Sequence, residues 1–181
     1  MYLPFPGGTI RSWRSDDAGA LARHANSRRV WANLRDRFPS PYTLDDADAW
    51  VRHCVRTVPA TDFAIEVNGE AVGGIGLVLR TDVEHVDAEV GYWLGEAYWG
   101  RGVMSEALQA FVPWALERFN LARMHAHVFA FNGASARVLE KAGFALEGRL
   151  RHSAFKDGTL IDQLLYARVR QDWRPSSSQG R

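Results

Sequence analysis

The stretch YWGRGVMSEAL, residues 98–108, places two glycines between an apolar run and a segment with helical periodicity. Gly100 and Gly102 follow the mostly apolar residues 90–94, and the periodic segment occupies residues 105–119. This order predicts a strand, a glycine turn and a helix that packs on a sheet. Because glycine adopts positive φ and carries no Cβ, the turn leaves its backbone open to a ligand.

The predicted helix presents unpaired N–H groups and the positive end of its dipole to that turn. Such a helix start favours an anion, most naturally a phosphate, and Arg101 and Ser105 add a charge and a hydroxyl there. A turn without any ligand is the alternative, since neither standard phosphate signature fits. A P-loop requires Gly-Lys-Ser/Thr, and a dinucleotide fingerprint requires a third glycine where Ser105 stands.

Two stretches carry a family resemblance: AEVGYWLGEAYWGRGVMSEAL, residues 88–108, and NGASARVLEKAGF, residues 132–144. Together they resemble the GNAT superfamily of N-acetyltransferases. The glycine turn is similar to the acyl-CoA pyrophosphate loop of that family, Gln/Arg-x-x-Gly-x-Gly/Ala. Trp99, Gly102 and Met104 stand at its three defined positions, and only Gly102 matches. The two stretches in this order resemble the branch of Rim-type ribosomal-protein N-terminal (alanine/serine) acetyltransferases.

The resemblance implies an α/β (mixed α+β) fold with a central, twisted, mostly antiparallel sheet of about seven strands and helices on both faces. It also implies an acetyl-CoA-dependent N-acyltransferase that acts on a primary amine, either a protein N-terminal α-amine or a small amine. We expect direct attack in a ternary complex, because the sequence shows no nucleophilic cysteine or serine arrangement. One alternative is a non-catalytic acyl-CoA-binding protein, since Trp99, Met104 and Leu139 depart from the family pattern. Another is an antibiotic or polyamine N-acetyltransferase.

Length and composition predict one acyltransferase domain over residues 1–173 and a flexible tail over residues 174–181. The net charge of +1 provides no field that would recruit nucleic acid or a membrane surface, so neither is an expected partner. A single cysteine, Cys54, and the lack of a leader or long apolar segment predict a cytoplasmic protein. Cys54 lies in an apolar helical pattern and is expected to be buried. Monomer and homodimer are both open.

The N-terminal residues predict a loosely packed segment, then a strand and a helix. Residues 1–8 are rich in Pro and Gly and are expected to pack loosely, whereas residues 9–14 alternate and predict a first strand. Asp16 or Asp17 is expected to cap the first helix. The helix after the glycine turn contains Pro113 and is expected to be one kinked helix rather than two.

Turn and capping signals are clearer further along. Thr43 and Asp46 resemble a capping box, and Asn68-Gly69 between alternating apolar runs predicts a type I′ hairpin turn. Asn132 is expected to cap a short helix, and Asp157-Gly158 to join two closing strands.

The resemblance implies a role for each part of the cofactor site. The backbone N–H groups of residues 100–105 would hold the pyrophosphate, and the strand backbone at Trp93 and Leu94 would pair with the pantetheine arm and stabilise the thioester oxyanion. Asn132 would contact the pantetheine or thioester end, beside its plain role as a helix cap. The expected cofactor-binding residues are Trp93, Leu94, Trp99, Gly100, Arg101, Gly102, Val103, Met104, Ser105 and Asn132.

Glu89 is the candidate general base. An α-amine with a pKa of about 7.7–8.0 lies about one unit from neutral pH, whereas a lysine amine at about 10.4 lies more than three units away. An α-amine acceptor therefore needs only a modest base. Glu89 precedes Trp99 by ten residues, roughly where members of the superfamily carry a glutamate base. A surface carboxylate is the alternative, because Glu84 and Asp87 lie close by.

Ser135 is the candidate partner of the leaving thiolate. Many members of the superfamily use a tyrosine seven residues after the capping asparagine, where this chain has Leu139. Ser135 occupies the place where the Rim-type branch has a serine proposed to hydrogen-bond the CoA sulfur. Because a hydroxyl is a poor proton source, we expect Ser135 to stabilise the thiolate. An ordinary serine in the first turn of a helix is the alternative.

His125 and His127 lie two apart on a predicted strand and therefore share a face. A zinc pair is conceivable. No metal is expected, however, because no third ligand with suitable spacing appears in the sequence.

Overall fold

The computed structural model describes residues 1–175, so most of the tail predicted over residues 174–181 lies outside the described range. No helix in the described part is both long enough and apolar enough to span a lipid bilayer. The elements are β1 (Tyr2–Phe5), β2 (Gly8–Ser12), η1 (Ser15–Asp17), α1 (Ala18–Ala25), α2 (Arg28–Trp31), α3 (Leu44–Arg56), β3 (Asp62–Val67), β4 (Glu70–Leu79), η2 (Asp82–Glu84), β5 (Asp87–Leu94), η3 (Glu96–Tyr98), α4 (Val103–Arg118), β6 (Arg123–Phe129), α5 (Gly133–Lys141), β7 (Ala145–Lys156) and β8 (Thr159–Val169).

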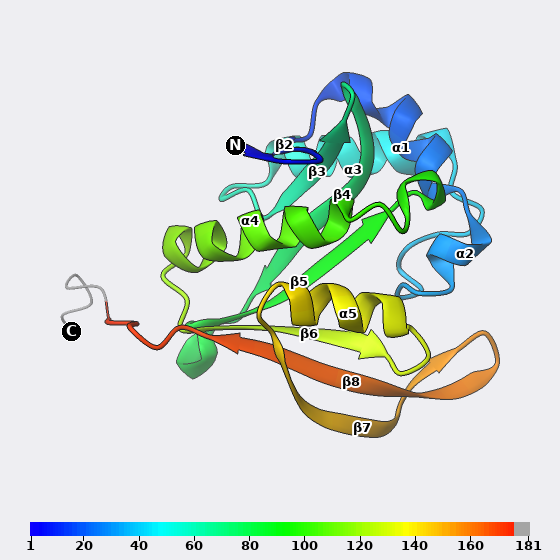
Figure 1. The fold of residues 1–181 in the computed structure, drawn as a ribbon. Helices are drawn as coiled ribbons and strands as arrows, with labels where there is room; N and C mark the ends of the chain where they lie inside the picture. The colour runs from blue at the N-terminus through cyan, green and yellow to red at the C-terminus, as the bar shows by residue number, and fades with distance from the viewer. Residues whose placement is uncertain (176–181) are drawn as a thin grey trace.

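A twisted sheet of eight strands runs through the molecule in the order β1-β2-β3-β4-β5-β6-β8-β7 (Figure 1). Every neighbouring pair is antiparallel except β5 and β6, which are parallel and are connected by α4. This confirms the predicted mixed fold. The additional strand is β1, which comes from the segment expected to pack loosely. It forms a hairpin with β2, and the side chain of Phe5 is buried in the core.

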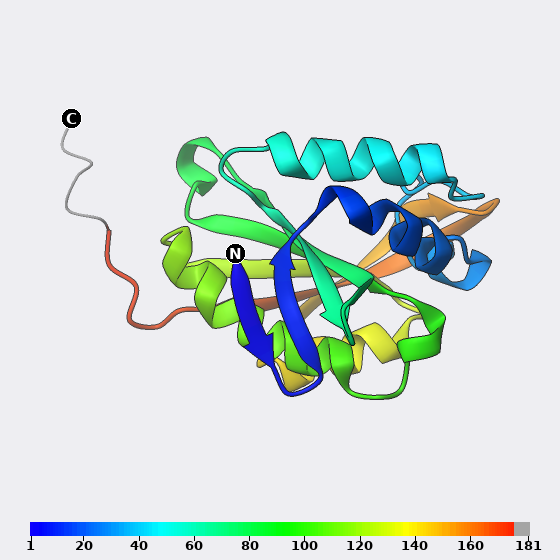
Figure 2. The same ribbon diagram turned by 90° about the horizontal axis from the view of Figure 1, so that it is seen from above.

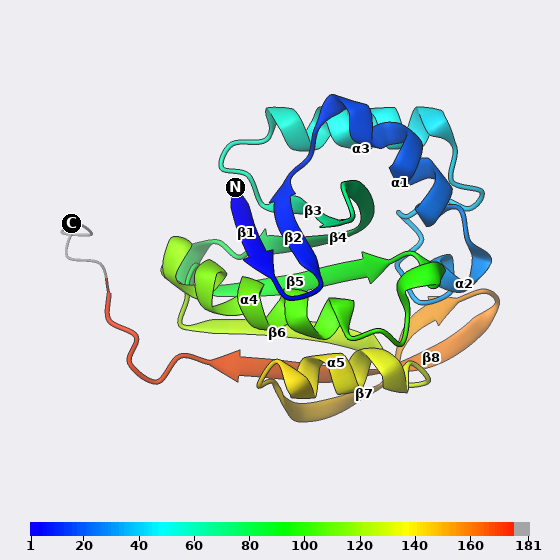
Figure 3. The ribbon, with the colours of Figure 1, turned by 45° about the horizontal axis from the view of Figure 1, so that its top comes forward.

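Helices cover both faces of the sheet, with α4 and α5 on one face and α1 and α3 on the other (Figures 2 and 3). Each face has its own hydrophobic core. Leu108 and Phe111 of α4 are fully buried on one face, and Leu21 of α1 packs with Val51 and Cys54 of α3 on the other. Burial raises the pKa of the Cys54 thiol to about 12, which confirms the prediction of a small buried hydrophobe.

The two parallel strands separate soon after they meet. They pair only at Asp87↔Arg123, Ala88↔Met124 and Glu89↔His125. Beyond Glu89, residues 90–94 of β5 continue to pair with β4, whereas β6 continues along β8. Among residues 1–175, one edge of β5 is therefore left without a strand partner from Val90 to Leu94.

The structure confirms the predicted turns and helix caps whose geometry depends on one short segment of the chain. Asn68 and Gly69 have φ of 53° and 81°, as the predicted hairpin turn requires. The Thr43–Asp46 capping box is present, and the Asn132 side chain accepts a hydrogen bond from Ser135 N. Pro113 lies inside a single α4, as predicted.

Asp17 is the N-cap residue of α1, one of the two positions predicted. Its carboxylate makes no cap bond to the helix, however, and instead accepts two hydrogen bonds of 2.7 Å from the Arg11 guanidinium. This helix also ends at Ala25, because the Ser27 side chain accepts the N–H groups of Arg29 and Val30 and caps a separate short helix.

Candidate active site

The glycine turn has the backbone that the sequence predicts. Gly100 and Gly102 have φ of 72° and 85°, in the left-handed region that favours glycine. Gly102 is the N-cap of α4, which begins two residues earlier than predicted. Glu106 N donates to Gly102 O at 3.0 Å, so the N–H groups of residues 103–105 precede the first intrahelical bond. These N–H groups form the candidate phosphate site.

Not every side chain predicted at this turn faces a ligand. Val103 and Met104 are buried in the core beneath α4, so they offer only their backbone. Ser105 is half-buried, whereas Arg101 is exposed and stacks 5.7 Å from the centre of the Tyr98 ring. A mobile guanidinium is therefore available beside the candidate phosphate site.

Trp99 fixes the turn to the end of β5. Its Nε1 donates a hydrogen bond of 2.7 Å to Leu94 O, and the Arg29 guanidinium lies 5.1 Å from the centre of its ring. The family pattern has glutamine or arginine at this position. In this chain, the indole gives the turn a rigid attachment to the strand that precedes it.

The unpaired edge of β5 exposes alternate backbone groups. Gly95 N donates to Val72 O at 2.8 Å, which identifies the pair Val72 and Gly95 as hydrogen-bonded. Because such pairs alternate in an antiparallel ladder, the N–H and C=O of Trp93 point toward β4 and those of Leu94 point away from it. The pantetheine contact predicted for Trp93 and Leu94 is therefore better placed at Leu94. The Trp93 indole packs 5.6 Å from the Phe38 ring on the α1/α3 face.

Tyr92 was missed by the sequence analysis and lies at the centre of the α4/α5 side of the site. Its hydroxyl lies 2.8 Å from Ser135 Oγ in the first turn of α5 and 3.3 Å from Ser135 O. Burial raises the pKa of the Tyr92 phenol well above its usual value. Asn132 holds Ser135 in place through the cap bond, and Leu139 is fully buried in the core. The structure thus places the Tyr92 hydroxyl beside that of Ser135. Position 139, where many family members have a tyrosine acid, holds a buried leucine.

Glu89 lies on the opposite face of β5, at the last position where β5 and β6 pair. Its half-buried carboxylate accepts a hydrogen bond from Arg35 and lies 3.2 Å from His127 Nδ1. Both partners were missed, because Arg35 comes from the loop between α2 and α3, and His127 from β6. The alternative interpretation, a surface carboxylate, does not describe this half-buried and paired Glu89.

The two sets of groups therefore meet at the gap between β5 and β6 from opposite sides. Tyr92 packs against the core beneath α4 and contacts Ser135 of α5, whereas Glu89, three residues earlier on β5, belongs to the opposite face of the sheet. Helices α4 and α5 cover the first face, and α1 and α3 the second (Figure 3). A thioester that entered along α4 would meet an amine that entered from the other face.

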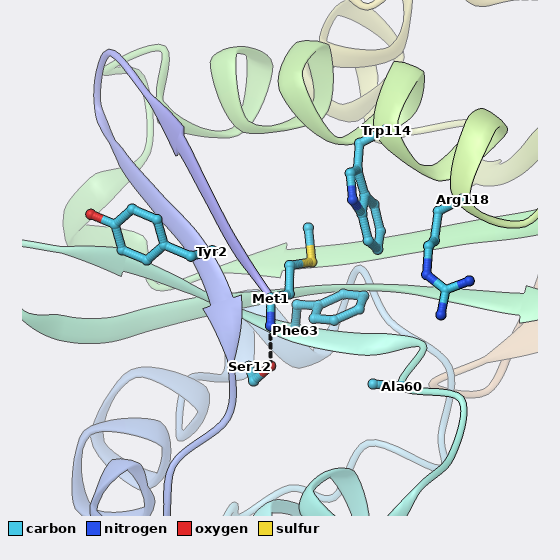
Figure 4. Close-up of a pocket in the computed structure, with 7 residues that line it drawn as sticks. All are labelled: Met1, Tyr2, Ser12, Ala60, Phe63, Trp114 and Arg118. Atoms are coloured by element: carbon cyan, nitrogen blue, oxygen red, sulfur yellow. Dashed lines mark hydrogen bonds between the residues drawn. The ribbon is translucent and has the colours of Figure 1, made fainter.

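A separate hollow of about 280 Å³ lies elsewhere, between the β1–β2 hairpin and the last turns of α4 (Figure 4). Met1, Phe63 and Trp114 are among the residues that line it. Trp114 is near the opposite end of α4 from Gly102. None of the predicted site residues lines this hollow, and the site described above is distinct from it.

Comparisons with known proteins identify the family and the fold. Residues 9–145 match the family model described as "Acetyltransferase (GNAT) domain". The chain is 32% identical over 169 residues to an uncharacterised N-acetyltransferase, p20, of Bacillus licheniformis, covering 91% of this chain and 94% of the relative. It is 35% identical over 97 residues to the ribosomal-protein-serine acetyltransferase of Escherichia coli, covering 52% of this chain and 54% of that one.

A solved structure of a ribosomal L7/L12 α-N-protein acetyltransferase in complex with coenzyme A shares the fold, with a TM-score of 0.81 at 22% identity. The match covers 93% of this chain and 98% of that one. The family model spans most of the sequence, including the glycine turn and the N-terminus of α5. This chain therefore belongs to the GNAT family of N-acetyltransferases.

Proposed function

We propose that this protein transfers the acetyl group of acetyl-CoA to the α-amine of a protein N-terminus, by direct attack in a ternary complex. One observation carries the proposal. Where β5 leaves β6, a carboxylate and a pair of hydroxyls lie on opposite faces of the same strand. Amide formation from a thioester needs a proton acceptor on the amine side and a donor on the sulfur side.

The cofactor would lie along the unpaired edge of β5. Its pyrophosphate would accept hydrogen bonds from the free N–H groups of residues 103–105. The Arg101 guanidinium would supply a positive charge beside it. The pantetheine arm would accept a hydrogen bond from the outward N–H of Leu94, as an added strand does, while Leu94 O stays bonded to the Trp99 indole. A neighbouring outward N–H of β5 would donate to the thioester oxygen, where negative charge develops.

The residues around the gap divide the chemistry between them. The amine nitrogen attacks the thioester carbonyl, the carbon–sulfur bond breaks, and the amine proton passes to Glu89, directly or through a water molecule. Tyr92 would donate a hydrogen bond to Ser135 Oγ, 2.8 Å away, and Ser135 would in turn donate a hydrogen bond to the departing thiolate. The thiolate is stabilised by this hydrogen bond, so it leaves without taking a proton from a stronger acid.

Charge around Glu89 favours a peptide over a polycation. Helix α2 and the loop after it carry four arginines and one aspartate between residues 28 and 37, and Arg35 of the loop reaches Glu89. Arg28 and Arg29 are paired with Asp157 and Glu96, so the repulsion of a polyamine or aminoglycoside would come from Arg35 and Arg37. The name of the Escherichia coli relative, a ribosomal-protein-serine acetyltransferase, points to the same acceptor class.

Acetyl transfer to synthetic peptides tests the proposal. The purified protein is incubated with acetyl-CoA and one of three acceptors: a peptide with a free N-terminus, the same peptide with a blocked N-terminus and a free lysine, or spermidine. Mass spectrometry is expected to show one acetyl group on the first peptide only. Acetylation of spermidine alone would show that the acceptor is a polyamine and not a protein N-terminus. Binding of acetyl-CoA without any acetylated product would favour a non-catalytic binding protein.

A further inference from the structure

We propose that Glu89, His125 and His127 form a binding site for a zinc ion. Each of the three side chains offers one ligand atom, and these atoms all lie within 4.8 Å of one another. Spacing along the chain indicated no third ligand for the two histidines, because Glu89 comes from the neighbouring strand. The register Glu89↔His125 brings the three together on one face of the sheet.

The distances suit a small tetrahedral ion. Glu89 Oε1 and His127 Nδ1 are 3.2 Å apart, and the proton shared between them must leave Nδ1 before this nitrogen can bind zinc. Two ligands bound at about 2.0–2.1 Å from a tetrahedral zinc lie about 3.3 Å from each other. Two imidazoles and one carboxylate form a donor set that prefers zinc to magnesium or calcium.

His125 is already oriented as a metal ligand. Its side chain is 5% exposed, and its Nδ1 lies 3.0 Å from Asp87 Oδ1. A carboxylate only accepts, so Nδ1 carries the proton and Nε2 keeps its lone pair. Zinc ligands are commonly fixed by this carboxylate–histidine pairing. Arg123 lies 3.5 Å from the other oxygen of Asp87 and holds it in turn.

Arg35 is the cation that zinc would have to displace. It donates to Glu89, but its side chain is 51% exposed and lies on a loop, so it can turn into solvent when the ion binds. The Glu89 carboxylate then faces the ion, while Asp87 stays behind His125 and holds its Nδ1. Three protein ligands leave a fourth position for water.

Zinc at this site would take the carboxylate that the proposed function uses as general base. Micromolar zinc is therefore expected to inhibit acetyl transfer, and a chelator to restore it. This consequence rests on the proposed function, whereas binding of the ion does not.

Zinc binding is tested directly on the full-length protein after treatment with a chelator. Titration calorimetry with zinc chloride is expected to show one ion per chain. Asp87→Asn should weaken binding by about tenfold or more through the orientation of His125. His127→Gln should abolish one-to-one binding, and it avoids truncating the buried His125. His85→Gln is the matched control, since this exposed histidine lies outside the cluster.

Cobalt chloride gives a second readout, because a tetrahedral cobalt site absorbs strongly in the visible range and a hydrated ion does not. No one-to-one binding in the folded wild type, or binding that His127→Gln leaves intact, would overturn the zinc site. Zinc binding by a protein without transferase activity would instead overturn only the proposed function.

Discussion

The Tyr92 hydroxyl lies 2.8 Å from Ser135 Oγ and joins β5 to the first turn of α5. If Tyr92 acts by orienting Ser135, Tyr92→Phe should lower kcat for acetyl transfer about fivefold, the equivalent of one hydrogen bond of about 1 kcal/mol. KM for acetyl-CoA should stay unchanged, because the phenyl ring keeps its packing. Steady-state assays of thiol release measure both constants.

The double variant separates this mechanism from a packing effect. Tyr92→Phe combined with Ser135→Ala should be no slower than Ser135→Ala alone, since both changes remove one hydrogen-bonded unit. Tyr2→Phe is the control, because Tyr2 is exposed and lies on β1. If the reductions in kcat of the two single variants multiply in the double variant, Tyr92 does not act through Ser135.

Replacement of Glu89 by Gln tests the base. The amide cannot accept the amine proton, so kcat should fall about a hundredfold at neutral pH while acetyl-CoA affinity is retained. The wild-type kcat/KM should rise with pH as the α-amine loses its proton, with a midpoint at about 7.7–8.0. Rates of the variant that equal those of the wild type between about pH 6 and 9 would remove Glu89 from the mechanism. Glu84→Gln, in the turn before β5, is the matched control.

The sequence was informative wherever one short segment decides the geometry. Asn68-Gly69 demands positive φ, Thr43 needs only Asp46 three residues later, and the turn at Gly102 needs only its own backbone. Each of these features depends on chemistry between neighbours in the chain. The glycine turn could therefore be located, together with the family resemblance that it carries.

The missed features all depend on the register of distant segments. Tyr92 meets Ser135 across 43 residues, and Glu89 meets Arg35 across 54. Strand alternation places Glu89 and Tyr92 on opposite faces, but nothing in the sequence states which helix covers each face. Asp17 likewise stands at the N-cap of α1 as predicted, but its carboxylate binds Arg11 of β2, which the sequence could not indicate.

Gly102→Val tests the phosphate site. At φ of 85°, a β-branched residue is strained, and relief of the strain would move the free N–H groups of residues 103–105. Strain of about 1–3 kcal/mol would weaken coenzyme A binding by about tenfold to a hundredfold. Titration calorimetry measures the affinity. Gly19→Val, on an exposed part of α1 with open space around it, is the control. Unchanged affinity in a folded Gly102→Val variant would refute the assignment of the turn.

Asp17→Ala should destabilise the fold by about 3 kcal/mol. The Arg11 guanidinium is 2% exposed and would lose two hydrogen bonds of 2.7 Å, although Glu66 would remain as a partner. Urea denaturation of the variant and the wild type measures the difference. Asp16→Ala, at the exposed neighbouring position, should change stability by less than about 0.5 kcal/mol. Equal losses in the two variants would show that the buried ion pair contributes nothing specific.

Asp62, at the start of β3, should make the protein less stable as the pH rises. Burial raises the pKa of its carboxyl above the usual value, so the folded chain holds this proton more tightly than the unfolded chain does. Its contribution to stability is therefore fully present below the unfolded pKa of about 3.9 and is lost as the pH rises through the higher folded value.

Asp62→Asn removes this titration and keeps the acceptor for the Thr61 hydroxyl, which donates to Asp62 at 2.9 Å. The variant should be more stable than the wild type at pH 7, and the difference should shrink toward zero as the pH falls to about 4. Urea denaturation at several pH values measures it, with Asp16→Asn as the exposed control. A wild type that is more stable than Asp62→Asn at pH 7 would show that the ionised carboxylate gains more from its neighbours than burial costs it.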